Sequence, residues 1–227
     1  MYHVGSLAFF ISGKSLIVSH SNRFIFVKPM RVGGTSFEAA ISQFCDAEED
    51  LVWTDEERMH LSAAEARNQV TKEQWEDYTK ITIIRNPWDM MASYYFFCQE
   101  VMAKENGLFC PAYFDVFLLW QLRGSMPASR CHWILDGDLW ADVHIRFENF
   151  DAACRDVWLK LGIPFFSLPR LREGRKPDGL HYSMMYGEQS MKVIQETYAF
   201  EIEKFGYIFE HVYKNGNNLN WIPYAAD

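Results

Sequence analysis

Short apolar runs alternate along the chain with longer stretches whose apolar residues recur at helical spacing. The runs are rich in β-branched and aromatic residues, and they predict strands at 16–19, 24–27, 81–84 and 143–147. The first two runs are close enough to form a hairpin about Ser21-Asn22. The longer stretches predict helices at 35–44, 62–70, 71–78, 87–103, 111–124, 150–161 and 188–205.

The alternation of strands and helices predicts an α/β fold with a central, mainly parallel sheet flanked by helices. The run from Ile81 to Ile84 is almost wholly apolar, as expected of a strand that is buried on both faces of a parallel sheet. Ligands of such sheets bind at the carboxyl ends of the strands. At 227 residues and 49% hydrophobic content, the chain is expected to form a single domain, 1–227.

The segment after the strand at 24–27 has the features of an anion-binding loop. It reads KPMRVGGTS, and its glycine pair allows a tight turn that brings backbone N–H groups close to a ligand. The helix that follows adds further N–H groups and the positive end of its dipole. By itself, the segment is also compatible with a simple turn capped by Thr35 or Ser36. The candidate ligands of a phosphate or sulfate are Arg31, Val32, Gly33, Gly34, Thr35 and Ser36, with Lys28 nearby.

This loop differs from the P-loop of nucleoside triphosphatases. That motif, G-x-x-x-x-G-K-[ST], has a lysine directly after its last glycine, whereas here the basic residue precedes the glycines and Thr35 follows them. No acidic residue ends the run at 81–84, where one would hold Mg²⁺. A small-molecule kinase with a degenerate P-loop is therefore kept as an alternative, which predicts ATP binding and dependence on magnesium.

A second anion-binding segment follows the strand at 81–84. Arg85 stands at the end of that strand, and Asn86-Pro87 predicts the start of a helix. Ser93 comes eight residues after Arg85, about two helical turns on, so its hydroxyl can lie on the same side as the guanidinium. An arginine fork and a hydroxyl suit a phosphate. The alternative is that Arg85 pairs with Asp89 and Ser93 packs against a neighbouring helix.

Together the two segments resemble the cofactor-binding motifs of sulfotransferases that use 3′-phosphoadenosine 5′-phosphosulfate (PAPS). The second motif of that family, R-[DN]-P-x-x-x-x-x-S-x-Y, is complete from Arg85 to Tyr95 here. The resemblance covers about 24–209 and is closest to the carbohydrate-type branch, which includes heparan and chondroitin sulfotransferases and bacterial relatives. It implies a P-loop-like three-layer fold in which the first loop holds the 5′-phosphosulfate, while Arg85 and Ser93 hold the 3′-phosphate.

One residue departs from the family pattern. Relatives have a lysine two residues before the glycine pair, where it touches the bridging oxygen and helps the leaving group depart, and this chain has Arg31. Arginine keeps the charge, but its flat head is not equivalent to a compact ammonium. We assign the leaving-group role to Arg31, with Lys28 as the second candidate. The same change leaves open a non-catalytic relative that binds the nucleotide only.

Sulfuryl transfer to an alcohol needs a base, and histidine suits this because its ordinary pKa is near neutrality. His60 lies between the two motifs, directly before a helix whose start is marked by the capping box Ser62 and Glu65. Resembling sulfotransferases have a histidine here that acts as general base in several members, so His60 is the catalytic candidate. Without the resemblance it would be read as a surface-loop histidine. Glu65 and Glu38 are fallback bases, and Glu38 is expected to serve the first turn of its own helix.

The predicted loop at 163–186 is long for a compact domain, and such loops are usually functional. Its segment LREGRKPDG loosely resembles the basic segment that in relatives reaches the 3′-phosphate or covers the nucleotide. On that ground Arg172 and Arg175 are cofactor-binding candidates, and Lys176 adds to the local positive charge. The alternative is a solvated basic loop.

Composition and charge argue against several classes of binding partner. A net charge of −8 and a pI near 5.4 argue against nucleic acid, and mildly against a strongly anionic polysaccharide. No apolar stretch approaches the roughly 20 residues that a membrane span needs, and the N-terminus does not read as a signal peptide, so a cytoplasmic location is expected. Five cysteines without a C-x-x-C pair predict free thiols, with a Cys98–Cys110 bridge as the alternative.

The function predicted by these residues and by the resemblance is PAPS-dependent sulfotransfer to a hydroxyl acceptor. The resemblance implies a carbohydrate acceptor and 3′-phosphoadenosine 5′-phosphate (PAP) as the product nucleotide. A sulfuryl group carries less charge than a phosphoryl group, so no metal is expected. No oligomeric state is predicted.

Overall fold

A computed structural model describes residues 16–45, 60–105, 107, 109–121, 130–164, 168–169, 171, 176–215 and 218–223. Its strands are β1 (Leu16–Ser19), β2 (Phe24–Val27), β3 (Thr79–Ile84), β4 (Ile134–Leu135), β5 (Asp138–Leu139), β6 (Val143–Arg146), β7 (Glu210–Asn215) and β8 (Asn218–Pro223). Its α-helices are α1 (Gly34–Ile41), α2 (Ala63–Arg67), α3 (Lys72–Asp77), α4 (Pro87–Phe97), α5 (Phe114–Gln121), α6 (Phe150–Leu161), α7 (Glu188–Thr197) and α8 (Ala199–Phe205). Short 3₁₀ turns cover Ser42–Phe44, Arg130–His132, Phe147–Asn149 and Tyr182–Met185.

The central sheet has the strand order β1-β2-β3-β6. β1 pairs antiparallel with β2, in the predicted hairpin, and the other two pairings are parallel. Every residue of β1 and β2 is buried, because helices cover both faces of the sheet. The carboxyl ends of β2 and β3 therefore lie side by side, so the segments that follow them start at the same edge.

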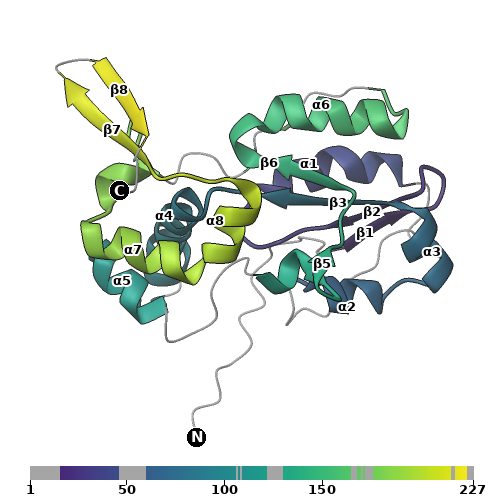
Figure 1. Ribbon diagram of the computed structural model, residues 1–227, viewed down its shortest axis with the longest axis horizontal. Coiled ribbons are helices and arrows are strands. Elements are labelled where there is room, and N and C mark those ends of the chain that lie inside the picture. Colours follow the sequence, from purple (N-terminus) through teal and green to yellow (C-terminus); the bar gives the residue numbers. More distant parts are fainter. Residues whose placement is uncertain are drawn as a thin grey trace, which may run out of the picture.

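Alternating side chains of β2 pack into two different cores, which makes the molecule three-layered here. Phe24 and Phe26 face α1 and α6, where the Phe26 and Phe37 ring centroids are 4.7 Å apart and Phe37 lies 5.1 Å from Trp158. The opposite face of the sheet packs on α2 and on the segment that contains Trp140. Figure 1 shows α1 and α6 on one side of the sheet and α2 on the other.

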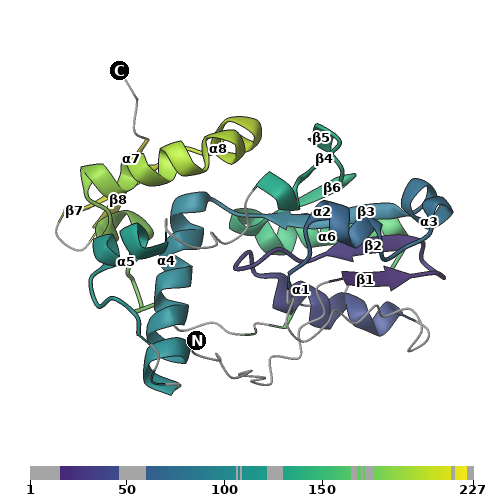
Figure 2. The same ribbon diagram turned by 90° about the horizontal axis from the view of Figure 1, so that it is seen from below.

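A second group of elements lies beyond the carboxyl ends of the strands. In two perpendicular views, α4, α5 and α7 stand together beside the sheet (Figures 1 and 2). α4 leads directly away from β3 and continues into a π-helix at Cys98–Glu105. Its residue Trp88 is buried, donates its indole N–H to the Met191 carbonyl at 3.1 Å and packs on Phe209. Trp88 thus belongs to the core that joins α4 to the C-terminal helices.

One sequence prediction fails in this second group, and two hairpins of the fold were not foreseen. The helix predicted at 188–205 is two helices, α7 and α8, which meet at Tyr198. Tyr198 has φ −110° and ψ 27°, outside the helical region, and its ring is buried with the hydroxyl 3.7 Å from the Met91 sulfur. Burial of this ring therefore accompanies a turn that helical spacing alone does not reveal. The hairpins β4–β5 and β7–β8 were not predicted.

All five cysteines are free thiols, as the sequence predicts, so the alternative Cys98–Cys110 bridge is absent from the structure. None of the described helices has both the length and the apolar character that a membrane crossing requires.

Candidate functional site

The loop between β2 and α1 is shaped by its two glycines. Gly33 has φ 84°, a left-handed conformation that side chains disfavour, and a Cβ atom there would lie 2.5 Å from the Phe147 ring. A Cβ atom on Gly34 would lie 2.3 Å from Cγ of Lys28. The first turn of α1, one residue earlier than predicted, presents backbone N–H groups to the same loop, and the Ser36 N–H bonds back to the Gly33 carbonyl at 3.3 Å.

Lys28 and Glu38 form a buried ion pair beneath this loop. The Lys28 ammonium lies 2.6 Å from a Glu38 carboxylate oxygen, and the two side chains are only 5% and 9% exposed. The expectation that Glu38 serves the first turn of α1 was wrong, because Glu38 lies one turn further on and neutralises Lys28 instead. An isolated buried ammonium would be strongly unfavourable, so this pairing is needed wherever Lys28 is buried.

Arg31 reaches across to the second predicted motif. Its backbone adopts φ 65°, and its guanidinium donates to the hydroxyl of Ser93 at 3.0 Å and to the Ser93 carbonyl at 3.3 Å. The guanidinium also lies 4.6 Å from the centroid of the Phe97 ring. A left-handed conformation is unusual for a residue other than glycine. At Arg31 it accompanies a side chain that points toward α4 rather than along the loop.

Arg85, in the segment after β3, contacts the loop after β2. Its Nη1 donates to the Arg31 backbone oxygen at 2.9 Å, and its face lies 3.9 Å from the centroid of the Phe147 ring. The two loops therefore lie together, as the sequence predicts for segments that follow neighbouring parallel strands. Of the two alternatives for the side chain, the structure shows the ion pair: Nε and Nη2 donate to one Asp89 oxygen at 2.8 and 2.6 Å.

The start of α4 is held by further polar contacts. The side chain of Asn86 caps the helix by accepting from Trp88 and Asp89 N–H groups. The Asn86 N–H donates to Glu148 at 2.6 Å, and the other Glu148 oxygen accepts from the Tyr207 hydroxyl at 3.4 Å. This carboxylate comes from the 3₁₀ turn after β6 and Tyr207 follows α8, so segments far apart in the chain fix the backbone next to Arg85.

His60 lies beside the first loop. Its Nδ1 is 3.0 Å from the Lys28 backbone oxygen, and since a carbonyl can only accept, Nδ1 carries the proton and Nε2 keeps its lone pair. Burial lowers the pKa of His60 to about 4, and the charges of Lys28 and Arg31 act in the same direction. The predicted capping box of Ser62 and Glu65 is present and fixes the helix that starts after His60. The side chain is thus an uncharged base at neutral pH.

The loop before α7 contacts both predicted anion sites. The Leu171 N–H donates to the Ser36 hydroxyl at 3.1 Å, and the Lys176 ammonium lies 3.4 Å from the second oxygen of Asp89. Arg172 and Arg175 lie outside the described residues. Within the described ranges, no group of three or more His, Cys, Asp or Glu side chains is arranged to hold a metal ion.

Known proteins match this chain in fold alone. No protein-family model matches it, and no curated protein matches its sequence. Its structure is similar to the crystal structure of mouse sulfotransferase SULT7A1 complexed with PAP, with a TM-score of 0.53 over 82% of this chain and 86% of that chain. The chain has a sulfotransferase fold. The predicted α/β architecture, with its mainly parallel sheet between helical layers, is thereby confirmed. At 14% identity the likeness assigns no residue a role.

Sequence reasoning missed the partners that this sulfotransferase fold brings together from distant segments. Phe147 contacts both Gly33 and Arg85, yet it reads in the sequence as an ordinary strand residue. Lys176 was noted only as one of several basic residues, and its pairing with Asp89 links positions 87 residues apart. The Arg85–Asp89 pair was not missed, because it was one of the two alternatives for Arg85, and its spacing of four residues at the start of a helix suits such a pair.

Proposed function

We propose that this protein is a PAPS-dependent sulfotransferase that transfers the sulfuryl group to a hydroxyl acceptor. The observation that carries the proposal is the contact between the two anion-binding loops, in which Arg85 Nη1 lies 2.9 Å from the Arg31 backbone oxygen. Loops this close can bind the two ends of one doubly phosphorylated adenosine. The fold shared with a sulfotransferase solved in complex with PAP supports the same proposal.

The first loop would bind the 5′-phosphosulfate. Backbone N–H groups from Val32 to Thr35, in the loop and at the start of α1, give the hydrogen-bond donors and the positive helix end that such a group needs, and the Ser36 hydroxyl lies beside them. Because the Lys28 ammonium is neutralised by Glu38, Arg31 is the better candidate to stabilise charge on the leaving oxygen. Its guanidinium is held against Ser93 and Phe97, so the Arg31 head group starts beside the proposed 3′-phosphate ligand Ser93.

The second loop would bind the 3′-phosphate through Arg85 and Ser93. The Arg85 guanidinium is only 10% exposed and is held by the Arg31 carbonyl and the Phe147 ring, so its orientation is set before a ligand arrives. Lys176, from the loop before α7, brings a second cation within 3.4 Å of the Arg85 partner Asp89. Donors oriented in advance bind a phosphate without the entropy cost of ordering them.

When bound, PAPS supplies a sulfuryl group on a phosphate leaving group. In the proposed reaction Nε2 of His60 takes the acceptor hydroxyl proton as the acceptor oxygen bonds to sulfur, and the sulfur–oxygen bond to the phosphate breaks with its electron pair on the phosphate. The Lys28 carbonyl keeps the other imidazole proton on Nδ1, which leaves Nε2 as the accepting atom. Most of the acceleration would come from positioning and charge stabilisation.

Nucleotide binding is the first test of this proposal. Isothermal titration calorimetry should show binding of PAP, and weaker or no binding of ATP with or without Mg²⁺. Preference for MgATP over PAP would support the kinase alternative instead. Transfer of labelled sulfate from PAPS should then be screened over carbohydrate and small-alcohol acceptors, in excess chelator as well as in its absence. The resemblance favours a carbohydrate, and transfer only to non-sugar alcohols would overturn that part.

A further inference from the structure

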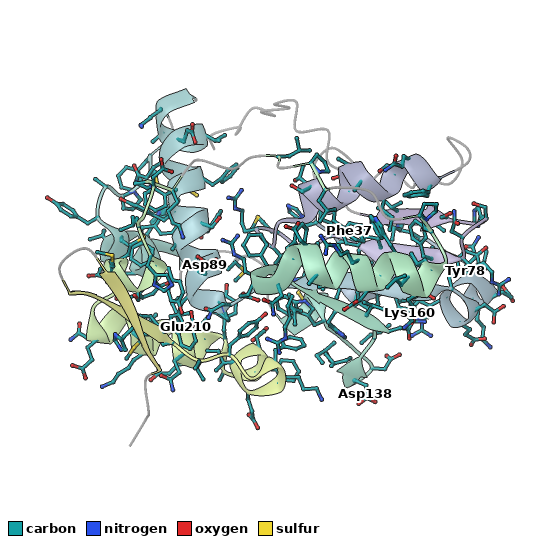
Figure 3. The ribbon with its side chains drawn as sticks, turned by 90° about the horizontal axis from the view of Figure 1, so that it is seen from above. Phe37, Tyr78, Asp89, Asp138, Lys160 and Glu210 are labelled. Atoms are coloured by element: carbon teal, nitrogen blue, oxygen red, sulfur yellow. The ribbon has the colours of Figure 1, made fainter. Side chains whose placement is uncertain are left out.

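Asp89 occupies the donors that the proposed site would offer to a 3′-phosphate. One of its oxygens accepts from Arg85 Nε at 2.8 Å and from Nη2 at 2.6 Å, which is one edge of the guanidinium fork. The other oxygen lies 3.4 Å from the Lys176 ammonium. Asp89 itself is 17% exposed and lies on α4 near the end of the sheet (Figure 3). A carboxylate and a phosphate oxygen compete for such donors because both are anionic acceptors.

Arg85 does not depend on Asp89 for its orientation. The Arg31 backbone oxygen accepts from Nη1 at 2.9 Å, and the Phe147 ring lies under the guanidinium plane at 3.9 Å. These two contacts come from the loop after β2 and from the turn after β6, and neither involves Asp89. If Asp89 turned away, the guanidinium would still be held along one edge and on one face.

Asp89 also has a source of stabilisation besides Arg85. It is in the first turn of α4, where the positive end of the helix dipole stabilises a carboxylate whether or not Arg85 is its partner. Burial raises its pKa, but the charges of Arg85 and Lys176 outweigh this effect and hold the pKa of the Asp89 carboxyl below its usual value. The group is therefore an anion at neutral pH while it pairs with Arg85 and Lys176.

We propose that Asp89 is an internal competitor for the 3′-phosphate, which weakens binding of the nucleotide and speeds release of the product PAP. This inference rests on the proposed function. Release of product limits turnover in many enzymes, and a carboxylate that returns to Arg85 as the phosphate leaves would lower the barrier to that step. A nucleotide without a 3′-phosphate does not displace Asp89, so Asp89 has no effect on its affinity.

The test compares PAP with adenosine 5′-phosphate, which lacks the 3′-phosphate. Calorimetry and stopped-flow displacement should show that Asp89→Asn binds PAP about tenfold more tightly, with a correspondingly slower release rate, because breaking one charge-assisted pair is no longer required. The affinity for adenosine 5′-phosphate should change less than about twofold. Asparagine keeps an oxygen that can accept from Arg85, and Asp89→Ser provides a second variant of smaller volume. Thermal unfolding establishes that each variant is folded.

A matched control removes another helical ion pair of the same spacing. Glu188 and Lys192 are four residues apart on α7 and 2.8 Å from each other, so Glu188→Gln should leave both nucleotide affinities unchanged. Weaker PAP binding by folded Asp89→Asn and Asp89→Ser would overturn the inference and make Asp89 a positioning residue. Equal tightening of both nucleotides would also overturn it, because that result reports only a change in overall charge. Failure of the wild-type protein to bind PAP would instead contradict the proposed function.

Discussion

His60 Nδ1 lies 3.0 Å from the backbone oxygen of Lys28, the first residue after β2. This contact links the candidate base to the anion-binding loop, because the same backbone segment continues into the glycine pair. It also decides which nitrogen accepts a proton, since the carbonyl requires a donor at Nδ1. The base comes from the segment before α2, and the Lys28 carbonyl ties it to the loop after β2.

Replacement of His60 by asparagine should abolish most sulfotransfer without affecting nucleotide binding. The asparagine amide can still donate to the Lys28 carbonyl, but it cannot take a proton. We expect turnover to fall by about 10²- to 10⁴-fold, with the dissociation constant of PAP unchanged. The control is His20→Ala, because His20 is exposed and lies in the turn before β2, at the opposite end of that strand from the loop. Unchanged turnover in His60→Asn would remove His60 as the base.

The stability of the protein should also depend on His60 below neutral pH. The pKa of His60 is about 4 in the folded protein and near 6.5 in an unfolded chain, so between these values only the unfolded state binds the proton. Stability is therefore lost as pH falls from about 6.5 to 4, by about 3 kcal/mol from this group. Urea unfolding of the wild type and of His60→Asn over this range should show a smaller loss in the variant, and parallel curves would contradict the assignment.

Local patterns predicted the elements that carry the site, because these depend on neighbours in the sequence. The β1–β2 hairpin, the strand before Arg85 and the capping box after His60 all follow from short runs of residues. The helix at 150–161 was predicted with its observed bounds, since Gly162 ends it in a left-handed conformation. Two loops after neighbouring parallel strands then had to start at one edge of the sheet.

The partners of the site residues could not be predicted in the same way. His60 contacts a backbone carbonyl 32 residues earlier. Every residue has such a carbonyl, so the residue types do not show which one binds His60. The side chain of Arg31 was expected at the first loop, but a left-handed backbone directs it to Ser93, 62 residues later. Such contacts depend on how the layers pack, and periodicity along the chain carries no information about them.

Removal of one charge from the buried pair of Lys28 and Glu38 should destabilise the fold, whereas replacement of both residues by apolar ones should be tolerated. Glu38→Gln leaves the Lys28 ammonium buried without a counter-charge, and we expect a loss of about 3–5 kcal/mol in the free energy of unfolding. The double variant Lys28→Met with Glu38→Leu should recover most of that loss. Glu76→Gln, which breaks the exposed pair with Lys72, should cost less than about 1 kcal/mol. A destabilised double variant would show that the charges themselves are needed.

Replacement of Arg85 by lysine should separate recognition of the 3′-phosphate from the rest of nucleotide binding. Lysine keeps the positive charge but loses the fork that contacts Asp89 and the Arg31 carbonyl. We expect PAP to bind at least about tenfold more weakly, with little change for adenosine 5′-phosphate. Calorimetry with both nucleotides checks this. An equal loss for both would mean that Arg85 supports the loop rather than the 3′-phosphate.

Replacement of Gly33, the left-handed glycine of the first loop, should destabilise the protein in two ways that can be measured separately. Gly33 and Gly137 have φ values of 84° and 94°, so alanine at either position costs about 1–2 kcal/mol through the backbone. A Cβ atom on Gly137 meets nothing within 4 Å, whereas one on Gly33 lies 2.5 Å from the Phe147 ring. Gly33→Ala should therefore lose about 1–3 kcal/mol more than Gly137→Ala in chemical denaturation.

This additional loss should be accompanied by weaker PAP binding, because the Phe147 ring that must move also lies against the Arg85 guanidinium. Phe147→Leu in the Gly33→Ala background relieves the overlap, so it should restore part of the stability without restoring PAP affinity. Recovery of both would show that the ring only fills space. Equal destabilisation by Gly33→Ala and Gly137→Ala would show that the close approach of Phe147 to the loop has no energetic consequence.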